Sequence, residues 1–336
     1  MKKALKIFFG VLLLLAALLG IDVAATWAPD RTVAELAPRW APPPSQFVPV
    51  MGMQVHLRDE GPRDDPSPIV LLHGTSASLH TWEGWTQALK GTRRVIRFDL
   101  PGFGLTGPFP DNDYSMEHYV AFVLATMDQL QVQHFTIAGN SFGGNVAWET
   151  ASWAAGRVDK LVLVDAAGYP FKAKSTPIAF RIAKTPVLNK LALVTLPRHI
   201  IESSVRNVYG DKSKVTPELV DRYYELTLRA GNRAALQERF KQAPSGGDAA
   251  RIPQLKLPTL VLWGGQDHLI PPDNAAHFVQ DIAGAQLVIF GDLGHVPQEE
   301  DPVRTVAALQ AFLAGTPAPA QPAEAPAPDA APANPS

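Results

Sequence analysis

Short apolar runs recur through the middle of the chain and predict buried strands. Continuous runs of this length are typical of strands that helices cover on both faces. Stretches with helical patterning separate most of them, and the alternation predicts an α/β fold with a mostly parallel sheet and flanking helices. The six runs are Ile69–Leu72, Val95–Phe98, Phe135–Ala138, Leu161–Val164, Leu260–Trp263 and Leu287–Phe290.

Two segments depart from this alternation. Phe47–Val50 and Val55–Arg58 flank Met51-Gly52-Met53 and predict an antiparallel hairpin. Residues 169–251 contain no convincing strand, and Thr216-Pro217-Glu218 is typical of a helix N-terminus. We therefore expect a helical cap, residues 169–251, inserted into an α/β core of residues 46–168 and 252–315. Its first part, Pro177–Leu196, is compatible with a substrate entrance, a membrane-facing surface or simple packing on the core.

The N-terminus has the pattern of a targeting segment. Three lysines within the first six residues precede an apolar run from Ile7 to Ile21. Residues 1–26 are therefore predicted to be a membrane anchor or a cleaved signal segment, and both alternatives stay open. Because the lysines precede the run, we expect an exported body, either anchored in the inner membrane or released to the periplasm or the medium.

The segments next to both ends are rich in proline. Residues 27–45 include Pro29, Pro38 and Pro42-Pro43-Pro44, and this pattern predicts a spacer without a long helix. Residues 316–336 are almost entirely Ala, Pro and a few polar residues, which predicts a disordered tail.

Composition narrows the possible chemistry. The 336 residues carry a formal net charge of −2 and no cysteine. A chain with no basic surplus and no nucleic-acid motif is a poor partner for nucleic acid. The missing cysteines exclude disulfides, thiolate metal sites and a cysteine nucleophile. No metal-ligand spacing is found, so we expect no metal and no cofactor. Asp292, Glu299, Glu300 and Asp301 are interpreted as a solvated acidic edge.

The sharpest chemical signal lies at the end of the third predicted parallel strand. Gly139-Asn140-Ser141-Phe142-Gly143 is a Gly-x-Ser-x-Gly motif between an apolar strand and a helical stretch. A serine in such a tight turn needs neighbours without bulky side chains, which Gly139 and Gly143 provide. Ser141 is therefore the candidate nucleophile.

A serine hydroxyl needs a base, and the base needs a group that orients it. Asp267 follows the run Leu260–Trp263, and His295 follows Leu287–Phe290. The carboxyl ends of parallel strands meet at one edge of the sheet, so these loops are expected to converge. His295 is the candidate base and Asp267 the candidate acid. Asp165, at the end of another apolar run, stays open as an alternative acid.

Acyl transfer also needs N–H donors for the oxyanion. The amide of Phe142, next to the nucleophile, is one expected donor. The loop after Ile69–Leu72 reads His73-Gly74-Thr75, and the Thr75 amide is the other expected donor. Gly74 permits the tight turn, and His73 is interpreted as an organiser of this loop.

These motifs, together with Asp99–Gly104 and Gly294-His295, resemble the α/β-hydrolase superfamily over residues 47–314. The resemblance implies that Asp99 is structural. Relatives that open epoxides or displace halide carry aspartate where this chain has Ser141. Asn140-Ser141 and the cap resemble hydrolases that cleave carbon–carbon bonds in aromatic ring-fission products. Those enzymes typically have tryptophan after the histidine, where this chain has Val296.

The complete set of groups predicts a serine hydrolase of small-molecule carboxylic esters that works through an acyl-serine intermediate. Carbon–carbon bond hydrolysis of ring-fission products is the alternative. A membrane-anchored binding protein that kept the fold without turnover is a further alternative from another class.

Overall fold

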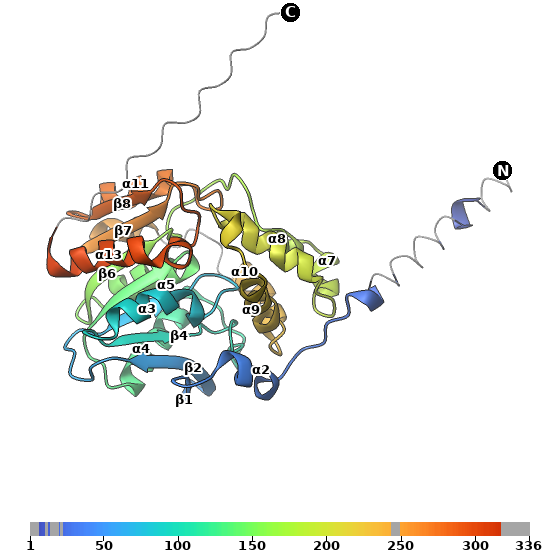
Figure 1. Cartoon of the computed structure of the whole chain (residues 1–336), viewed down its shortest axis with the longest axis horizontal. Helices are drawn as coiled ribbons and strands as arrows, with labels where there is room; N and C mark the ends of the chain where they lie inside the picture. The colour runs from blue at the N-terminus through green and yellow to red at the C-terminus, as the bar shows by residue number, and fades with distance from the viewer. Residues whose placement is uncertain (1–6, 11–12, 14–19, 21–22, 243–248, 317–336) are drawn as a thin grey trace, which may run out of the picture.

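The computed structural model describes residues 7–10, 13, 20, 23–242 and 249–316. Its centre is an eight-stranded sheet of order β1-β2-β4-β3-β5-β6-β7-β8 (Figure 1). β2 is antiparallel to both β1 and β4, and the other neighbours are parallel. The hairpin and all six parallel strands are confirmed. The strands are β1 Gln46–Val50, β2 Met53–Glu60, β3 Ile69–Leu72, β4 Val95–Phe98, β5 Phe135–Asn140, β6 Val158–Val164, β7 Thr259–Gly264 and β8 Gln286–Phe290.

Helices cover both faces of the sheet, which explains the continuous apolar runs. Successive residues of β3 point to opposite faces, so Val70 and Leu72 join one core cluster while Ile69 and Leu71 join another. Side chains from α4, α5 and α11 belong to the first cluster, and those from α3 and α13 to the second. The bounds are η1 Leu79–Trp82, α3 Glu83–Leu89, α4 Met116–Gln129, α5 Phe142–Trp153, η3 Ala249–Gln254, α11 Asp273–Asp281, α12 Pro297–Glu300 and α13 Pro302–Ala314.

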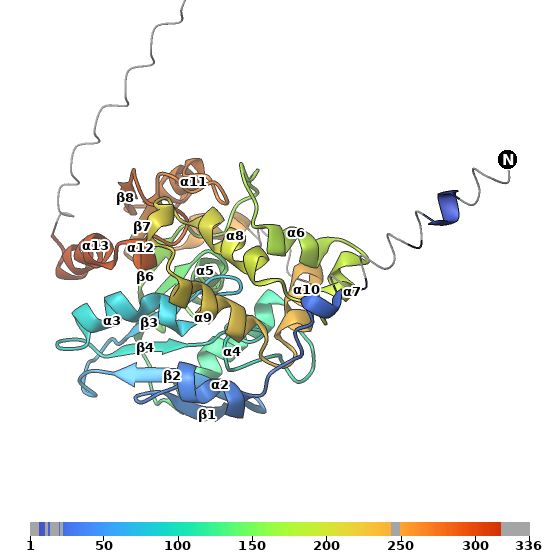
Figure 2. The same ribbon diagram turned by 45° about the vertical axis from the view of Figure 1, so that its right-hand side comes forward.

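A helical insertion follows β6, as the sequence predicts. Thr216 caps α9 by accepting a hydrogen bond from the Leu219 amide. Figure 2 shows α6 to α10 grouped beside one edge of the sheet. In the described part of residues 169–251 no strand forms. The elements of this cap are α6 Ile178–Lys184, α7 Leu188–Leu191, α8 Arg198–Val208, η2 Lys212–Lys214, α9 Pro217–Thr227 and α10 Asn232–Gln242.

The prediction of a spacer over residues 27–45 is wrong. Helix α2, Val33–Trp40, begins with a capping box between Thr32 and Glu35. Leu36 is fully buried in a cluster with residues of the core and of α9, and Arg39 pairs with two acidic side chains of α9. Proline weakens a helix, but the capping box and the contacts with the cap outweigh that cost here.

We expect Leu36→Ala to lower the free energy of unfolding by about 2–4 kcal/mol, because it leaves a cavity under α2. Urea unfolding followed by circular dichroism measures this difference. The matched control is Val303→Ala, whose side chain is 75% exposed and is expected to change stability by about 0.5 kcal/mol or less. Equal effects of the two changes would mean that α2 is not docked.

The described residues include no helix with the length and apolar character that a bilayer crossing requires. Most of the predicted anchor or signal segment, residues 1–26, lies outside the described ranges. Residues 317–336 of the predicted tail also lie outside them. Both interpretations, and the export of the body, stay predictions.

Candidate active site

Ser141 occupies a strained turn between β5 and α5. Its φ of +55° and ψ of −118° lie outside the favoured regions for a residue with a side chain. A Cβ on Gly139 would lie 2.1 Å from the Gly143 carbonyl oxygen, and a Cβ on Gly143 would lie 2.4 Å from the Leu72 carbonyl oxygen. Larger residues at these two positions would therefore force the turn apart.

His295 and Asp267 form a buried pair near this turn. The Nδ1 of His295 donates to Asp267 Oδ2 over 2.6 Å. Asp267 Oδ1 accepts from the Leu269 and Ile270 amides at 2.8 and 3.0 Å. A proton on Nδ1 leaves Nε2 free to accept one, which is the tautomer that a general base needs. Ser141 and His295 line the same cavity.

Asn140 ties the serine turn to the histidine loop. Its Nδ2 donates to the His295 carbonyl oxygen at 2.9 Å and to the Val164 carbonyl oxygen at 3.1 Å. Residues from three strand ends, β5, β6 and β8, therefore meet at one side chain. The sequence places Asn140 in the motif, but only the fold reveals this contact.

Glu300 is buried and binds the backbone of the loop that carries His295, so it does not belong to a solvated acidic edge. Its carboxylate is buried and accepts from the Gly294, Gly210 and Asp211 amides at 2.8, 3.0 and 2.6 Å. Glu299 pairs with Arg222 of α9. The interpretation of an acidic edge is therefore wrong for these two residues, because loops distant in sequence cover them. Glu300 holds the histidine loop against the end of α8.

Asp165 lies beside the buried pair. Its Oδ1 accepts from the Gly264 amide at 3.0 Å, and ligand atoms of Asp165, Asp267 and His295 lie within 4.8 Å of one another. Burial, followed by the nearby Asp267 charge, raises the pKa of Asp165 well above its ordinary value. The raised pKa favours the protonated form of Asp165, and Asp267 is the carboxyl that contacts the imidazole. A protonated carboxyl is also a poor metal ligand.

We expect Asp165→Asn to lower kcat by about tenfold at most, because an amide resembles a protonated carboxyl and one hydrogen bond is at stake. Steady-state hydrolysis of a soluble ester measures this. A loss as large as that of Asp267→Asn would instead assign the orienting role to Asp165.

The segments that carry the expected oxyanion donors lie beside the nucleophile: Phe142 follows Ser141, and Gly74 packs against it. Among the described residues, the Thr75 amide donates no hydrogen bond to a protein group. The Phe142 amide likewise donates none outside its own helix. Phe142 is the first residue of α5, where a helix leaves its N–H groups unpaired and its dipole favours negative charge. A Cβ on Gly74 would lie 3.1 Å from the Ser141 Cβ, so glycine allows the close approach.

His73 and Asp99 both form hydrogen bonds with backbone groups of nearby loops. His73 Nδ1 donates to the Gly74 carbonyl oxygen at 2.7 Å, and its Nε2 accepts from the Leu100 amide at 2.9 Å. Burial lowers the pKa of His73, which favours this neutral form. Asp99 accepts from the Leu79 amide at 2.8 Å and pairs with a buried histidine. Neither residue reaches the cavity lining.

Arg239 is a site residue that the sequence does not reveal. From α10, its Nη2 donates to Thr75 Oγ1 at 3.0 Å, and its guanidinium lies 4.3 Å from the Phe142 ring centroid. Burial lowers the pKa of Arg239 to about 10. No carboxylate pairs with it among the described residues. A buried positive charge thus touches both segments that carry the expected oxyanion donors.

A cavity of about 440 Å³ lies between the candidate catalytic groups and the cap. Ser141, His295 and Thr75 lie at its floor, and mainly aliphatic side chains form the rest of the wall. The segment Pro177–Leu196 contributes much of this wall, as expected for a substrate entrance. Its lining residues include Ala179, Phe180, Ile182, Leu188 and Leu191.

Known proteins resemble the chain over most of its length. The alpha/beta hydrolase fold family matches residues 67–302. The 2-hydroxymuconate semialdehyde hydrolase of Pseudomonas sp. strain CF600 is 28% identical over 83% of this chain and 96% of its own. The 2-hydroxy-6-oxo-2,4-heptadienoate hydrolase of Pseudomonas putida is 29% identical over 78% of this chain and 94% of its own.

A solved structure agrees with these relatives. The meta-cleavage product hydrolase of Pseudomonas fluorescens IP01 superimposes with a TM-score of 0.70 at 27% identity, over 80% of this chain and 97% of its own. The sheet order, the strained serine turn and these matches all indicate the same fold family. The chain therefore belongs to the alpha/beta hydrolase fold family and is a hydrolase.

Proposed function

We propose that this hydrolase cleaves uncharged carboxylic esters through an acyl-Ser141 intermediate. One observation carries the proposal: Ser141, Thr75 and a histidine that is paired with a buried carboxyl line a single cavity whose wall is mainly aliphatic. Each of these groups has a defined task in acyl transfer.

In the first half of the proposed reaction, His295 Nε2 takes the Ser141 proton as Oγ attacks the ester carbonyl. The Thr75 and Phe142 amides bind the resulting oxyanion, and the imidazolium then protonates the departing alcohol. In the second half, His295 removes a proton from water, which attacks the acyl-enzyme. The carboxylic acid leaves, and Ser141 regains its proton.

The cavity wall favours a neutral, apolar substrate. Among the described lining residues, Arg233 carries a guanidinium group. Its Nη2 donates a hydrogen bond of 2.6 Å to Asp30 Oδ1, which neutralises the charge. A substrate carboxylate would have to compete with Asp30 for that charge. Each methylene buried against the aliphatic wall contributes about 0.8 kcal/mol to binding.

Carbon–carbon bond hydrolysis is the second candidate, and the relatives favour it. Two are named for ring-fission substrates, a semialdehyde and a dienoate, and the solved structure is a meta-cleavage product hydrolase. Asn140-Ser141 also resembles that group. Against it stand Val296 in place of tryptophan and the paired state of Arg233.

A direct comparison of substrates tests both candidates. Purified full-length protein is assayed with p-nitrophenyl esters of graded acyl length and with a ring-fission dienoate. We expect kcat/KM to rise with acyl length and to exceed that for the dienoate. The reverse order would establish the second candidate. Labelling by a fluorophosphonate at a residue other than Ser141 would overturn both.

For the cellular location we propose an exported body, on the strength of the three lysines before the apolar run Ile7–Ile21. Protease treatment of intact spheroplasts tests this. Digestion of the body is the expected result, and full protection would contradict it.

A further inference from the structure

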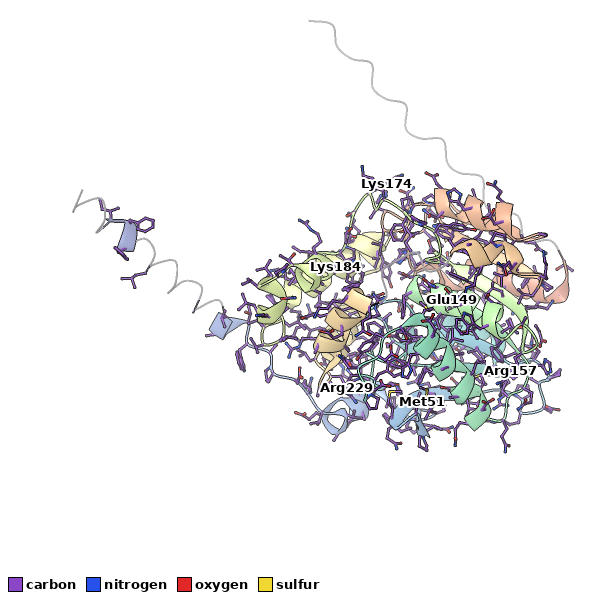
Figure 3. The ribbon with its side chains drawn as sticks, turned by 180° about the vertical axis from the view of Figure 1, so that it is seen from behind. Met51, Glu149, Arg157, Lys174, Lys184 and Arg229 are labelled. Carbon is purple, nitrogen blue, oxygen red and sulfur yellow. The ribbon has the colours of Figure 1, made fainter. Side chains whose placement is uncertain are left out.

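The outer face of the cap combines exposed apolar side chains with unpaired basic ones. Residues 166–201 contain no aspartate or glutamate, although the whole chain carries a net charge of −2. Six basic residues lie in the same stretch: Lys172, Lys174, Arg181, Lys184, Lys190 and Arg198. Arg198 pairs with Asp221, whereas the other five form no ion pair with a described carboxylate. Figure 3 shows Lys184 on α6 of the cap and Lys174 on the segment between β6 and α6.

Large apolar side chains accompany these charges. Val187, between α6 and α7, is 69% exposed and has a φ of +71°, which is unfavourable for a β-branched residue. Ile178, Leu188 and Leu193 are also exposed. Several exposed apolar side chains in one short segment, one of them on a strained backbone, are a feature of contact surfaces.

The N-terminal segment reaches the same face. Trp27, 58% exposed, pairs with Thr195 at the end of this stretch. The Ala28 amide donates to the Val194 carbonyl oxygen at 2.9 Å, and the Leu196 amide donates to the Thr26 carbonyl oxygen at 3.0 Å. In the sequence, the apolar run Ile7–Ile21 ends six residues before Trp27. We name Trp27 and the exposed side chains of residues 172–193 the outer cap face.

We propose that the outer cap face lies on an anionic lipid bilayer, with its apolar side chains among the acyl chains and its basic side chains at the headgroups. Charge complementarity favours this occupant, because each basic residue near an anionic surface contributes to binding while tryptophan prefers the interface. The adjacent apolar run in the sequence favours a bilayer over an acidic protein.

The same helices form the wall of the catalytic cavity, which gives the contact a functional consequence. Ala179, Ile182 and Leu191 line the cavity, while Arg181, Val187 and Lys190 do not. Lipophilic esters dissolved in the bilayer would thus enter between α6 and α7. This part of the inference rests on the proposed ester hydrolysis, whereas the bilayer contact does not.

Hydrogen–deuterium exchange of the full-length protein tests the contact independently of activity. Vesicles of phosphatidylglycerol are expected to slow exchange across residues 178–193, and vesicles of phosphatidylcholine are expected to do so far less. The double variant Arg181→Glu, Lys190→Glu should lose this protection. The control, Lys256→Glu, changes an exposed basic residue near the amino end of β7 that pairs with no described carboxylate, and it should retain this protection.

The rate of hydrolysis separates this inference from the proposed function. The charge-reversed variant should hydrolyse a soluble ester normally but a vesicle-embedded ester about tenfold more slowly. If neither the parent nor the variants hydrolyse any of the esters, the proposed function is refuted. The exchange data would still test the bilayer contact. Three results would overturn the contact: equal protection in the charge-reversed variant, protection only at rising protein concentration, or protection only by an acidic protein.

Discussion

Replacing Ser141 by alanine is expected to lower kcat by about 10⁴-fold to 10⁶-fold, because no acyl-enzyme can form without the hydroxyl. The remaining rate would come from the cavity and the oxyanion donors acting on water. Steady-state hydrolysis of a soluble ester measures the loss, and intact-protein mass spectrometry with a fluorophosphonate measures the loss of labelling.

The matched control is Ser203→Ala, an exposed serine of α8 that does not line the cavity. It should keep its activity within about twofold, as is usual for surface substitutions. The Ser141→Ala protein should unfold at the same temperature as the parent. A Ser141→Ala protein that performs every role of the parent would instead support the non-catalytic binding protein.

We expect Asp267→Asn to lower kcat by about 10⁴-fold through the tautomer of His295. Two amides, of Leu269 and Ile270, donate to Asp267 Oδ1, so the oxygen of an asparagine would stay at that position. Its NH₂ group would then face His295 Nδ1 and move the imidazole proton to Nε2. The imidazole could no longer accept the Ser141 proton.

Asp165→Asn is the matched comparison for this prediction, because both changes remove one carboxyl from the same buried cluster. Only the loss at Asp267 should be large. Measurement of kcat for both variants and of their thermal stability separates catalysis from folding. A loss below about tenfold for Asp267→Asn would show that another group orients His295.

Local patterns in the sequence were sufficient to predict the sheet and to place three candidate side chains after its strands. Buried parallel strands require continuous apolar runs, so their positions are visible without a structure. Ser141, Asp267 and His295 each follow such a run, and the carboxyl ends of parallel strands converge wherever the sheet forms. The need for glycine at positions 139 and 143 was also predictable from the motif, and the structure shows that backbone atoms leave no room for a Cβ there.

Contacts between distant segments were not visible in this way. Arg239 reaches Thr75 across 164 residues of sequence, and Arg39 pairs with Glu225 across 186. In the sequence, Arg239 belongs to a polar helix and α2 to a proline-rich stretch. Likewise Glu300 belongs to an acidic run until the loop after α8 covers it.

The two aspartates beside His295 show the same division. The sequence alone determined that one carboxyl follows β6 and another follows β7. Each aspartate stands just after an apolar run in the sequence, so its position relative to that strand can be predicted without the fold. The tertiary structure decided which one serves His295: burial and hydrogen bonding depend on all the neighbours, and those neighbours come from different strands.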